Sequence, residues 1–222
     1  MRCSLSSASP LTLLPHHGAI TPQAALVVAD LHLGKAPVLR EKGLPLPKSH
    51  TRQNLNRLFE LVVRNNVRRL VIAGDFLHGT ASRTPTVHDA VRDFLGSLSI
   101  PVTLVLGNHD RKNLPLPDDW PMEIVESLEL EGWHVVHDPA DAPPHRPSIS
   151  AHWHPVFRVQ DGKRTSLRLP CFWLKGQRLI LPSFGSFTGG QRIQPGGNDR
   201  VFAPLDGQVY ELPATMWSVN RS

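Results

Sequence analysis

The chain has only two cysteines among its 222 residues, and they lie far apart, at Cys3 and Cys171. Two such cysteines cannot form a disulfide framework, and without a Cys-x-x-Cys pair they do not indicate a thiolate metal site. No stretch approaches the ~20 apolar residues that a membrane-spanning helix needs. Residues 11–14 are too short for a signal-peptide core and end at Pro15. We therefore expect a cytoplasmic protein with no membrane contact.

A strong excess of one charge is also missing, since 24 Lys and Arg face 19 Asp and Glu, for a net charge of +5. This charge permits binding to a polyanion but equally fits an ordinary solvated surface, so it leaves both interpretations open. Proline and glycine, in contrast, are abundant, with 21 and 16 residues. With 40% apolar residues for a core, this composition favours short strands joined by tight turns over a helical bundle.

The first half of the chain predicts alternating strands and helices. Short apolar runs at residues 26–29, 69–73 and 101–106 are typical of buried strands. Two apolar stripes with helical spacing lie between them: Leu55, Leu58, Phe59, Val62 and Val63, then Val87, Val91, Phe94, Leu95 and Leu98. This order predicts parallel strands with right-handed crossovers.

The two ends of the chain read differently. Residues 1–25 predict an irregular or edge-strand segment, because Pro10, Pro15 and Pro22 interrupt regular pairing. Beyond residue 110 we expect mainly antiparallel strands, including a hairpin at Asp161-Gly162. We expect residues 1–222 to form one domain.

Polar side chains follow five of the strand-like runs at their carboxyl ends. They are Asp30 and His32, Asp75 after Gly74, Asn108 and His109, His137, and His152 and His154. Residues two apart in an extended segment point to the same side, so an Asp-x-His or His-x-His pair can hold one ion. Each motif alone has an ordinary explanation as a turn or a satisfied histidine. Together, at the sheet edge where α/β proteins build sites, they predict one functional site.

This series resembles the signature of the calcineurin-type metallophosphoesterases. The match comprises Asp30-x-His32, Gly74-Asp75, Gly107-Asn108-His109-Asp110, His137 and His152-x-His154. Four longer stretches, at residues 29–35, 74–78, 169–174 and 181–190, are similar to the bacterial ligase-associated metallophosphoesterases of the PdeM type. Two positions depart from the broad signature. His78 replaces an aspartate expected to orient the catalytic histidine, and Ala151 replaces a glycine, which we expect to be tolerated.

The resemblance implies a four-layer α/β/β/α sandwich with two mixed sheets and two divalent metal ions between the sheet edges. Asp30, His32 and His154 would bind one ion, Asn108, His137 and His152 the other, and Asp75 would bridge both. His109 would be the general acid for the leaving oxygen. The mixed oxygen and nitrogen donors suit Mn²⁺, with Fe or Zn as alternatives.

The implied function is a phosphodiesterase that uses metal-activated water and is associated with DNA repair, as an endonuclease with DNA ligase or helicase partners. Short gaps between the motifs leave no room for a capping domain, so we expect an open site that accepts a phosphodiester, nucleic acid included. A small-molecule phosphatase or nucleotide pyrophosphatase stays open as an alternative, as does a metal-stabilised, non-catalytic subunit of a repair complex. Lys35 and Arg111 either contact a substrate phosphate or lie in solvent, and residues 187–190 either line the cleft or serve turns.

Overall fold

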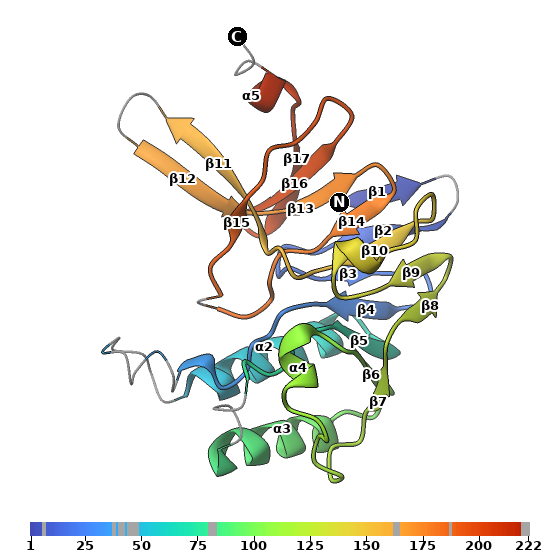
Figure 1. The fold of residues 1–222 in the computed structure, drawn as a ribbon, viewed down its shortest axis with the longest axis vertical. Coiled ribbons are helices and arrows are strands. Elements are labelled where there is room, and N and C mark those ends of the chain that lie inside the picture. Colours follow the sequence, from blue (N-terminus) through green and yellow to red (C-terminus); the bar gives the residue numbers. More distant parts are fainter. Residues whose placement is uncertain are drawn as a thin grey trace.

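The computed structural model describes residues 1–5, 8–36, 39, 43, 49–79, 84–161, 165–186 and 188–218. Two seven-stranded mixed sheets stack on each other, and the long helices cover the outside of the first sheet (Figure 1). The predicted α/β class with two mixed sheets is confirmed. Within the described residues, no helix is long and apolar enough to cross a membrane.

The first sheet has the strand order of the sequence. Its strands are β1 (Arg2–Leu5), β2 (Ala8–Leu13), β3 (Ala19–Ile20), β4 (Ala25–Val28), β5 (Arg69–Ala73), β6 (Val102–Val105) and β7 (Glu123–Val125). Strands β4, β5 and β6 pair in parallel, as predicted. Strand β7, which lies beyond residue 110 where we expected mainly antiparallel strands, also pairs in parallel. Their side chains alternate between two cores, since Leu26 faces the helices and Val27 faces the second sheet. Burial on both faces explains why these strands are continuous apolar runs.

Within residues 1–5 and 8–25, three strands extend the first sheet to its edge, as the edge-strand alternative of the prediction has it. Strands β1 to β3 pair antiparallel with their neighbours, and β1 lies at the sheet edge. Pro10 lies within β2 where the register with the edge strand β1 shifts, because Ser9 and Pro10 of β2 together lie opposite Ser4 of β1. A bulge at an edge strand accommodates a residue that has no N–H to donate.

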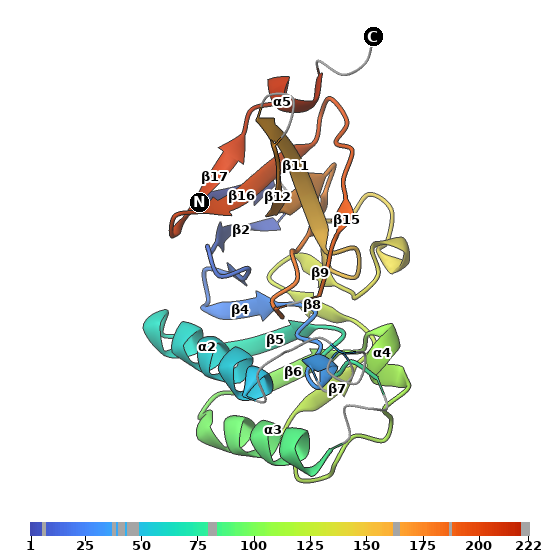
Figure 2. The same ribbon diagram turned by 90° about the vertical axis from the view of Figure 1, so that its left-hand side faces the viewer.

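Both predicted helices are present, as α2 (His50–Arg64) and α3 (Pro85–Ser97), side by side on the first sheet (Figure 2). The prediction that Phe59 and Val63 face the core was wrong, because their side chains are 36% and 56% exposed. Leu61 is buried in their place. At 3.6 residues per turn, Phe59 lies about 100° beyond Leu58, which is outside the buried stripe.

The second sheet runs in the order β17 (Gln208–Leu212), β16 (Arg200–Leu205), β13 (Phe172–Lys175), β14 (Arg178–Ile180), β10 (Ser148–Ser150), β9 (Trp133–Val135), β8 (Leu128–Leu130). Strands β9, β10 and β14 are parallel to one another, and the other pairings are antiparallel. Phe172 and Phe202 pack against the first sheet, whereas Trp173 and Val201 point to the opposite face.

In the described residues, a third small sheet covers that outer face, where the resemblance implied a helical layer. It has the order β12 (Thr165–Pro170), β11 (Pro155–Asp161), β15 (Gln191–Arg192), and the short helix α5 (Thr215–Ser218) lies beside it. Phe157 pairs with Leu169, which confirms the predicted hairpin, although Gly162 lies outside the described residues. The period-two pattern gives these strands one apolar face, and that face packs on the second sheet.

Candidate metal centre

The predicted site residues follow the carboxyl ends of β4, β5, β6, β9 and β10, in loops or, for Asn108 and His109, at the start of the short helix α4 (Asn108–Arg111). The carboxyl ends of these strands meet where the two large sheets face each other (Figure 1). Contacts between side chains connect all seven predicted ligands and His109 into one cluster, which comprises two groups of three residues with Asp75 between them.

The first group is Asp30, His32 and His154. The Oδ2 atom of Asp30 lies 3.3 Å from Nε2 of His154, and the Nε2 atoms of His32 and His154 are 3.3 Å apart. The carboxylate of Asp30 is fully buried, and its Oδ1 atom has no hydrogen-bond partner. A buried, unsatisfied carboxylate oxygen is costly unless a cation compensates it.

The second group is Asn108, His137 and His152. Nε2 of His137 lies 3.1 Å from Oδ1 of Asn108 and 3.1 Å from Nδ1 of His152. The other ring nitrogen of His137, Nδ1, donates to the carbonyl oxygen of Ala73 at 3.1 Å. This bond fixes the tautomer in which the lone pair of Nε2 points to the neighbouring donors, as a metal ligand requires.

Asp75 lies between the two groups. Its Oδ2 atom is 3.7 Å from Nε2 of His32, and its Oδ1 atom is 3.5 Å from Nε2 of His137. Oδ1 also accepts a hydrogen bond from the backbone N–H of His109 at 2.9 Å. One carboxylate therefore reaches both groups, which is the arrangement that a bridging ligand needs.

Five of the seven predicted ligands have a left-handed backbone. Their φ angles are 53° for Asp30, 45° for His32, 47° for Asp75, 65° for His152 and 46° for His154. Residues other than glycine adopt this conformation at a cost, and such residues cluster at functional sites. The strained turns direct the side chains inward from the sheet edge.

Burial and charge prepare these side chains for a cation. Burial, with smaller contributions from the nearby His154 and Lys35, lowers the pKa of His32 to about 2, so the imidazole is neutral. Burial also lowers the pKa of His154, but its hydrogen bond to Asp30 and the charges of Asp30 and Asp75 outweigh this, so the net shift is upward. The two carboxylates thus favour positive charge between them, and the donor set fits divalent metal ions.

Gly74 leaves space for the imidazole ring of His137, one of the predicted metal ligands. A Cβ atom at this position would lie 2.1 Å from Nδ1 of His137, and the φ angle of Gly74 is +82°. We expect Gly74→Ala to lower the free energy of unfolding by about 1–3 kcal/mol and to reduce metal content. Urea unfolding and metal analysis would measure both effects. The matched control is Gly96→Ala in α3, where an added Cβ atom meets nothing within 4 Å. This variant should raise the free energy of unfolding by about 0.5–1 kcal/mol. Wild-type stability and metal content in Gly74→Ala would contradict this role.

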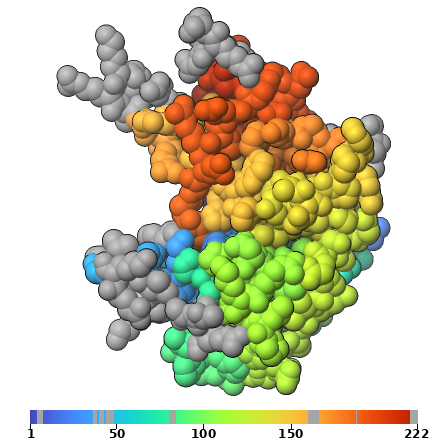
Figure 3. All heavy atoms as spheres, viewed as in Figure 1, coloured from blue at the N-terminus to red at the C-terminus, as the bar shows by residue number. Residues whose placement is uncertain are grey.

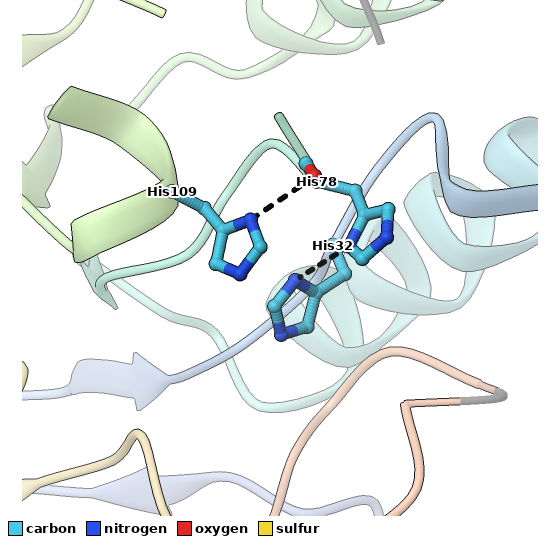
Figure 4. Close-up of side chains that lie close together, drawn as sticks. All are labelled: His32, His78 and His109. Carbon is cyan, nitrogen blue, oxygen red and sulfur yellow. Dashed lines mark hydrogen bonds between the residues drawn. The ribbon is translucent and has the colours of Figure 1, made fainter. Parts of the chain in front are cut away.

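His109 is held by the residue whose identity departs from the broad signature. Nδ1 of His109 donates to the main-chain carbonyl oxygen of His78 at 3.0 Å, and the two rings stack with centroids 5.2 Å apart (Figure 4). His78 Nδ1 also lies 3.3 Å from Nδ1 of His32. The structure thus answers how His109 is oriented without an aspartate, because a backbone carbonyl fixes its Nδ1 as the donor. One ring nitrogen from each of these three histidines lies within 4.8 Å of the others.

Asp110 has a structural role that the motif alone did not assign. Its carboxylate accepts hydrogen bonds from the N–H groups of Leu77 and Gly107, each at 3.0 Å, and so joins the loop after β5 to the start of α4 (Asn108–Arg111). Burial raises the pKa of Asp110 to about 6, although these N–H groups oppose the shift. The three-residue spacing from Gly107 to Asp110 is the signal in the sequence, since it is that of a capping box.

The other residues named from the motifs have mixed outcomes. Arg111 forms a two-pronged ion pair with Glu126 on the surface, so its charge is already paired. Lys35 is half-buried near the first group, and its Nζ lies 3.4 Å from the carbonyl oxygen of Thr188. Phe187 lies outside the described residues, whereas Thr188 and Gly189 line a cavity beside His154. Ala151 is fully buried between the large sheets.

Comparisons with known proteins agree with this geometry. A family model described as calcineurin-like phosphoesterase matches residues 25–170. The crystal structure of the Pseudomonas putida nuclease MPE is similar to this chain, with 32% identity, coverage of 96% of this chain and 99% of that chain, and a TM-score of 0.82. The phosphoesterase Yfce from E. coli shares 17% identity over 85% of this chain and 97% of its own, with a TM-score of 0.43. No curated protein matches the chain. The family model covers the chain from β4 to β12, and the similarity to the nuclease structure extends over nearly the whole chain. The chain therefore belongs to the calcineurin-like phosphoesterase family, a family of metal-dependent phosphoesterases.

Proposed function

We propose that the protein is a phosphodiesterase that uses two divalent metal ions, with Mn²⁺ as the first choice, and that its substrate is nucleic acid. The observation that carries this proposal is the position of Asp75, whose two carboxylate oxygens face separate groups of three donors. Two bound ions would polarise a phosphoryl oxygen and lower the pKa of a bound water.

The side chains around this centre would have two roles, metal binding and proton donation. Asp30, His32 and His154 would hold one ion, Asn108, His137 and His152 the other, with Asp75 shared. His109 is partly exposed, and its Nδ1 is fixed as a donor to the His78 carbonyl, which leaves Nε2 for a substrate. A proton on Nε2 would pass to the oxygen that leaves phosphorus.

The proposed substrate class rests on two similarities. This chain shares 32% identity with a structure described as a nuclease. Residues 169–174 and 181–190 resemble the ligase-associated enzymes of the PdeM type. We extend the proposal accordingly to endonucleolytic cleavage of DNA in a repair context, with a DNA ligase or helicase as partner. Recovery of a ligase or helicase with the tagged protein, from cells of its source, would test the partner.

The test of the proposed activity starts from protein stripped of metal with a chelator. We expect no turnover until Mn²⁺ is added, and then hydrolysis of bis(p-nitrophenyl) phosphate well above that of p-nitrophenyl phosphate. Fe²⁺ and Zn²⁺ serve as comparisons. Circular single-stranded DNA, which has no ends, should be cut if the enzyme is an endonuclease. Turnover of the monoester alone would favour a small-molecule phosphatase, and no turnover with any of these metals would favour a non-catalytic subunit.

A further inference from the structure

Two arginines lie directly opposite each other in the third sheet. Arg158 of β11 and Arg168 of β12 are partners in the antiparallel register, between the pairs Phe157 with Leu169 and Val159 with Leu167. Like charges at directly opposed positions repel each other and destabilise a sheet. Such a pair is therefore a feature that calls for an explanation outside folding.

These arginines occupy the outward face of the sheet. Phe157 and Leu169 are buried against the second sheet, so their neighbours Arg158 and Arg168 point away from it, and both are exposed. Arg192 of β15 is also exposed, and it lies opposite Val156, which shares the face of Arg158. Three arginines on three adjacent strands therefore share one face, which we call the arginine face (Arg158, Arg168 and Arg192).

Carboxylates do not balance the arginine face in the part of the chain that is described. Many other arginines form ion pairs there, among them Arg52, Arg69, Arg92, Arg111, Arg146 and Arg200. None of the ion pairs between described residues includes a member of the arginine face. The Arg168 guanidinium donates a hydrogen bond to the carbonyl oxygen of Gly190, at 2.9 Å. A face with this charge complements an anion.

The arginine face continues into the metal centre. Strand β11 begins at Pro155, directly after the predicted ligand His154. Val156 and its partner Pro170 precede the arginine pair on the same face, and both line a cavity of about 240 Å³ that His154 and Arg57 also line. In Figure 1 the β11–β12 hairpin projects at the upper left, and in Figure 3 the outline is hollowed beneath the orange residues of this region.

Two more cations lie at the cavity beside His154. The Arg57 guanidinium is half-buried, lies 4.3 Å from the centre of the Phe184 ring, and donates to the Phe184 carbonyl oxygen. Lys35 lies beside Thr188, which lines the same cavity. Among described residues, neither forms an ion pair with a carboxylate. Positive charge is therefore present at the cavity beside His154 as well as on the arginine face.

We propose that the arginine face binds the backbone phosphates of a single-stranded nucleic acid whose scissile phosphate lies at the metal centre. This inference rests on the proposed function and adds the polymeric nature of the substrate to it. At about 3.3 Å per residue, the four steps of extended chain from His154 to Arg158 span about 13 Å. Stacked nucleotides along one strand are about 3.4 Å apart, and an extended single strand spaces them more widely, so this distance corresponds to at most about four nucleotides. Oligonucleotides much shorter than this should not reach the arginine face.

The test compares Arg158→Ser/Arg168→Ser with wild type and with a control of equal charge, Arg2→Ser/Arg68→Ser. Arg2 and Arg68 are exposed, and Arg68 precedes β5 at the end of the sheet opposite the metal centre. Binding of a fluorescent 20-nucleotide oligo(dT) to chelator-treated protein is followed by anisotropy at several salt concentrations. The arginine-face variant should bind about 10-fold more weakly, and its log–log salt slope should be shallower by about 1.4, since each contact to a single strand contributes about 0.7. The control should match wild type in both respects.

Two further measurements separate the outcomes. With Mn²⁺, the arginine-face variant should hydrolyse bis(p-nitrophenyl) phosphate at the wild-type rate but cut the 20-mer more slowly. Should wild type fail to hydrolyse the small diester, the proposed function fails, while the anisotropy result still decides the arginine face. Arg192→Ser, on a separate strand, repeats the test if the double variant unfolds early in a thermal scan. Unchanged affinity and salt slope in both variants, or binding of duplex DNA only, would overturn the inference.

Discussion

The variant His109→Ala is expected to keep its metal ions and to hydrolyse a dinucleotide about 10²- to 10⁴-fold more slowly than wild type. The side chain of His109 is not one of the seven predicted ligands, so its loss should leave the contacts within both groups of three donors in place. Its backbone N–H, which donates to Asp75, is retained in the variant. What disappears is the ring whose Nδ1 is fixed by the His78 carbonyl and whose Nε2 can protonate a leaving oxygen.

The leaving group makes this prediction sharper. A nitrophenolate departs without protonation, whereas the ribose oxygen of a dinucleotide is a strong base and needs a proton. His109→Ala should therefore lose much less activity on bis(p-nitrophenyl) phosphate than on the dinucleotide. His88→Ala is the matched control, because His88 pairs with Asp119 away from the metal centre. Equal losses on both substrates would contradict the general-acid role, and an unchanged dinucleotide rate would remove it.

The variant Asp75→Asn should have the second large effect, with metal content and activity falling together. The substitution preserves shape but removes the charge shared by both groups. Loss of several kcal/mol of metal-derived stabilisation of the transition state corresponds to a rate at least about 100-fold lower. Metal analysis after gel filtration and the diester assay with excess Mn²⁺ measure the two effects.

Asp206→Asn is a suitable control for this variant, because Asp206 has the same φ of 47° as Asp75 but lies in the turn between β16 and β17. It should retain wild-type metal content and rate. If Asp75→Asn also retained both metal ions and full activity, a bridging role for Asp75 would be excluded.

The sequence predicted those parts of the site that depend on local pattern. Asp30 and Asp75 could be found because each follows a short apolar run, and the ends of parallel strands meet at one sheet edge. The orientation of His109 could not be predicted, since it depends on a main-chain carbonyl at His78, and any residue there supplies a carbonyl. Composition near His78 carries no signal for such a bond.

Features that depend on strand register or on packing also could not be predicted from the sequence. Arg158 and Arg168 are ten positions apart, and only the pairing of β11 with β12 brings them opposite each other. The exposure of Phe59 depends on how α2 is rotated against the first sheet, which its apolar spacing does not specify. The small sheet outside the second large sheet follows from packing among segments distant in the chain.

The most direct test is anomalous diffraction from crystals of the protein grown with Mn²⁺. Two peaks are predicted for each chain, one among Asp30, His32 and His154 and one among Asn108, His137 and His152, with the carboxylate of Asp75 in contact with both. A single peak, peaks elsewhere, or two ions that do not share Asp75 would contradict the proposed two-metal centre.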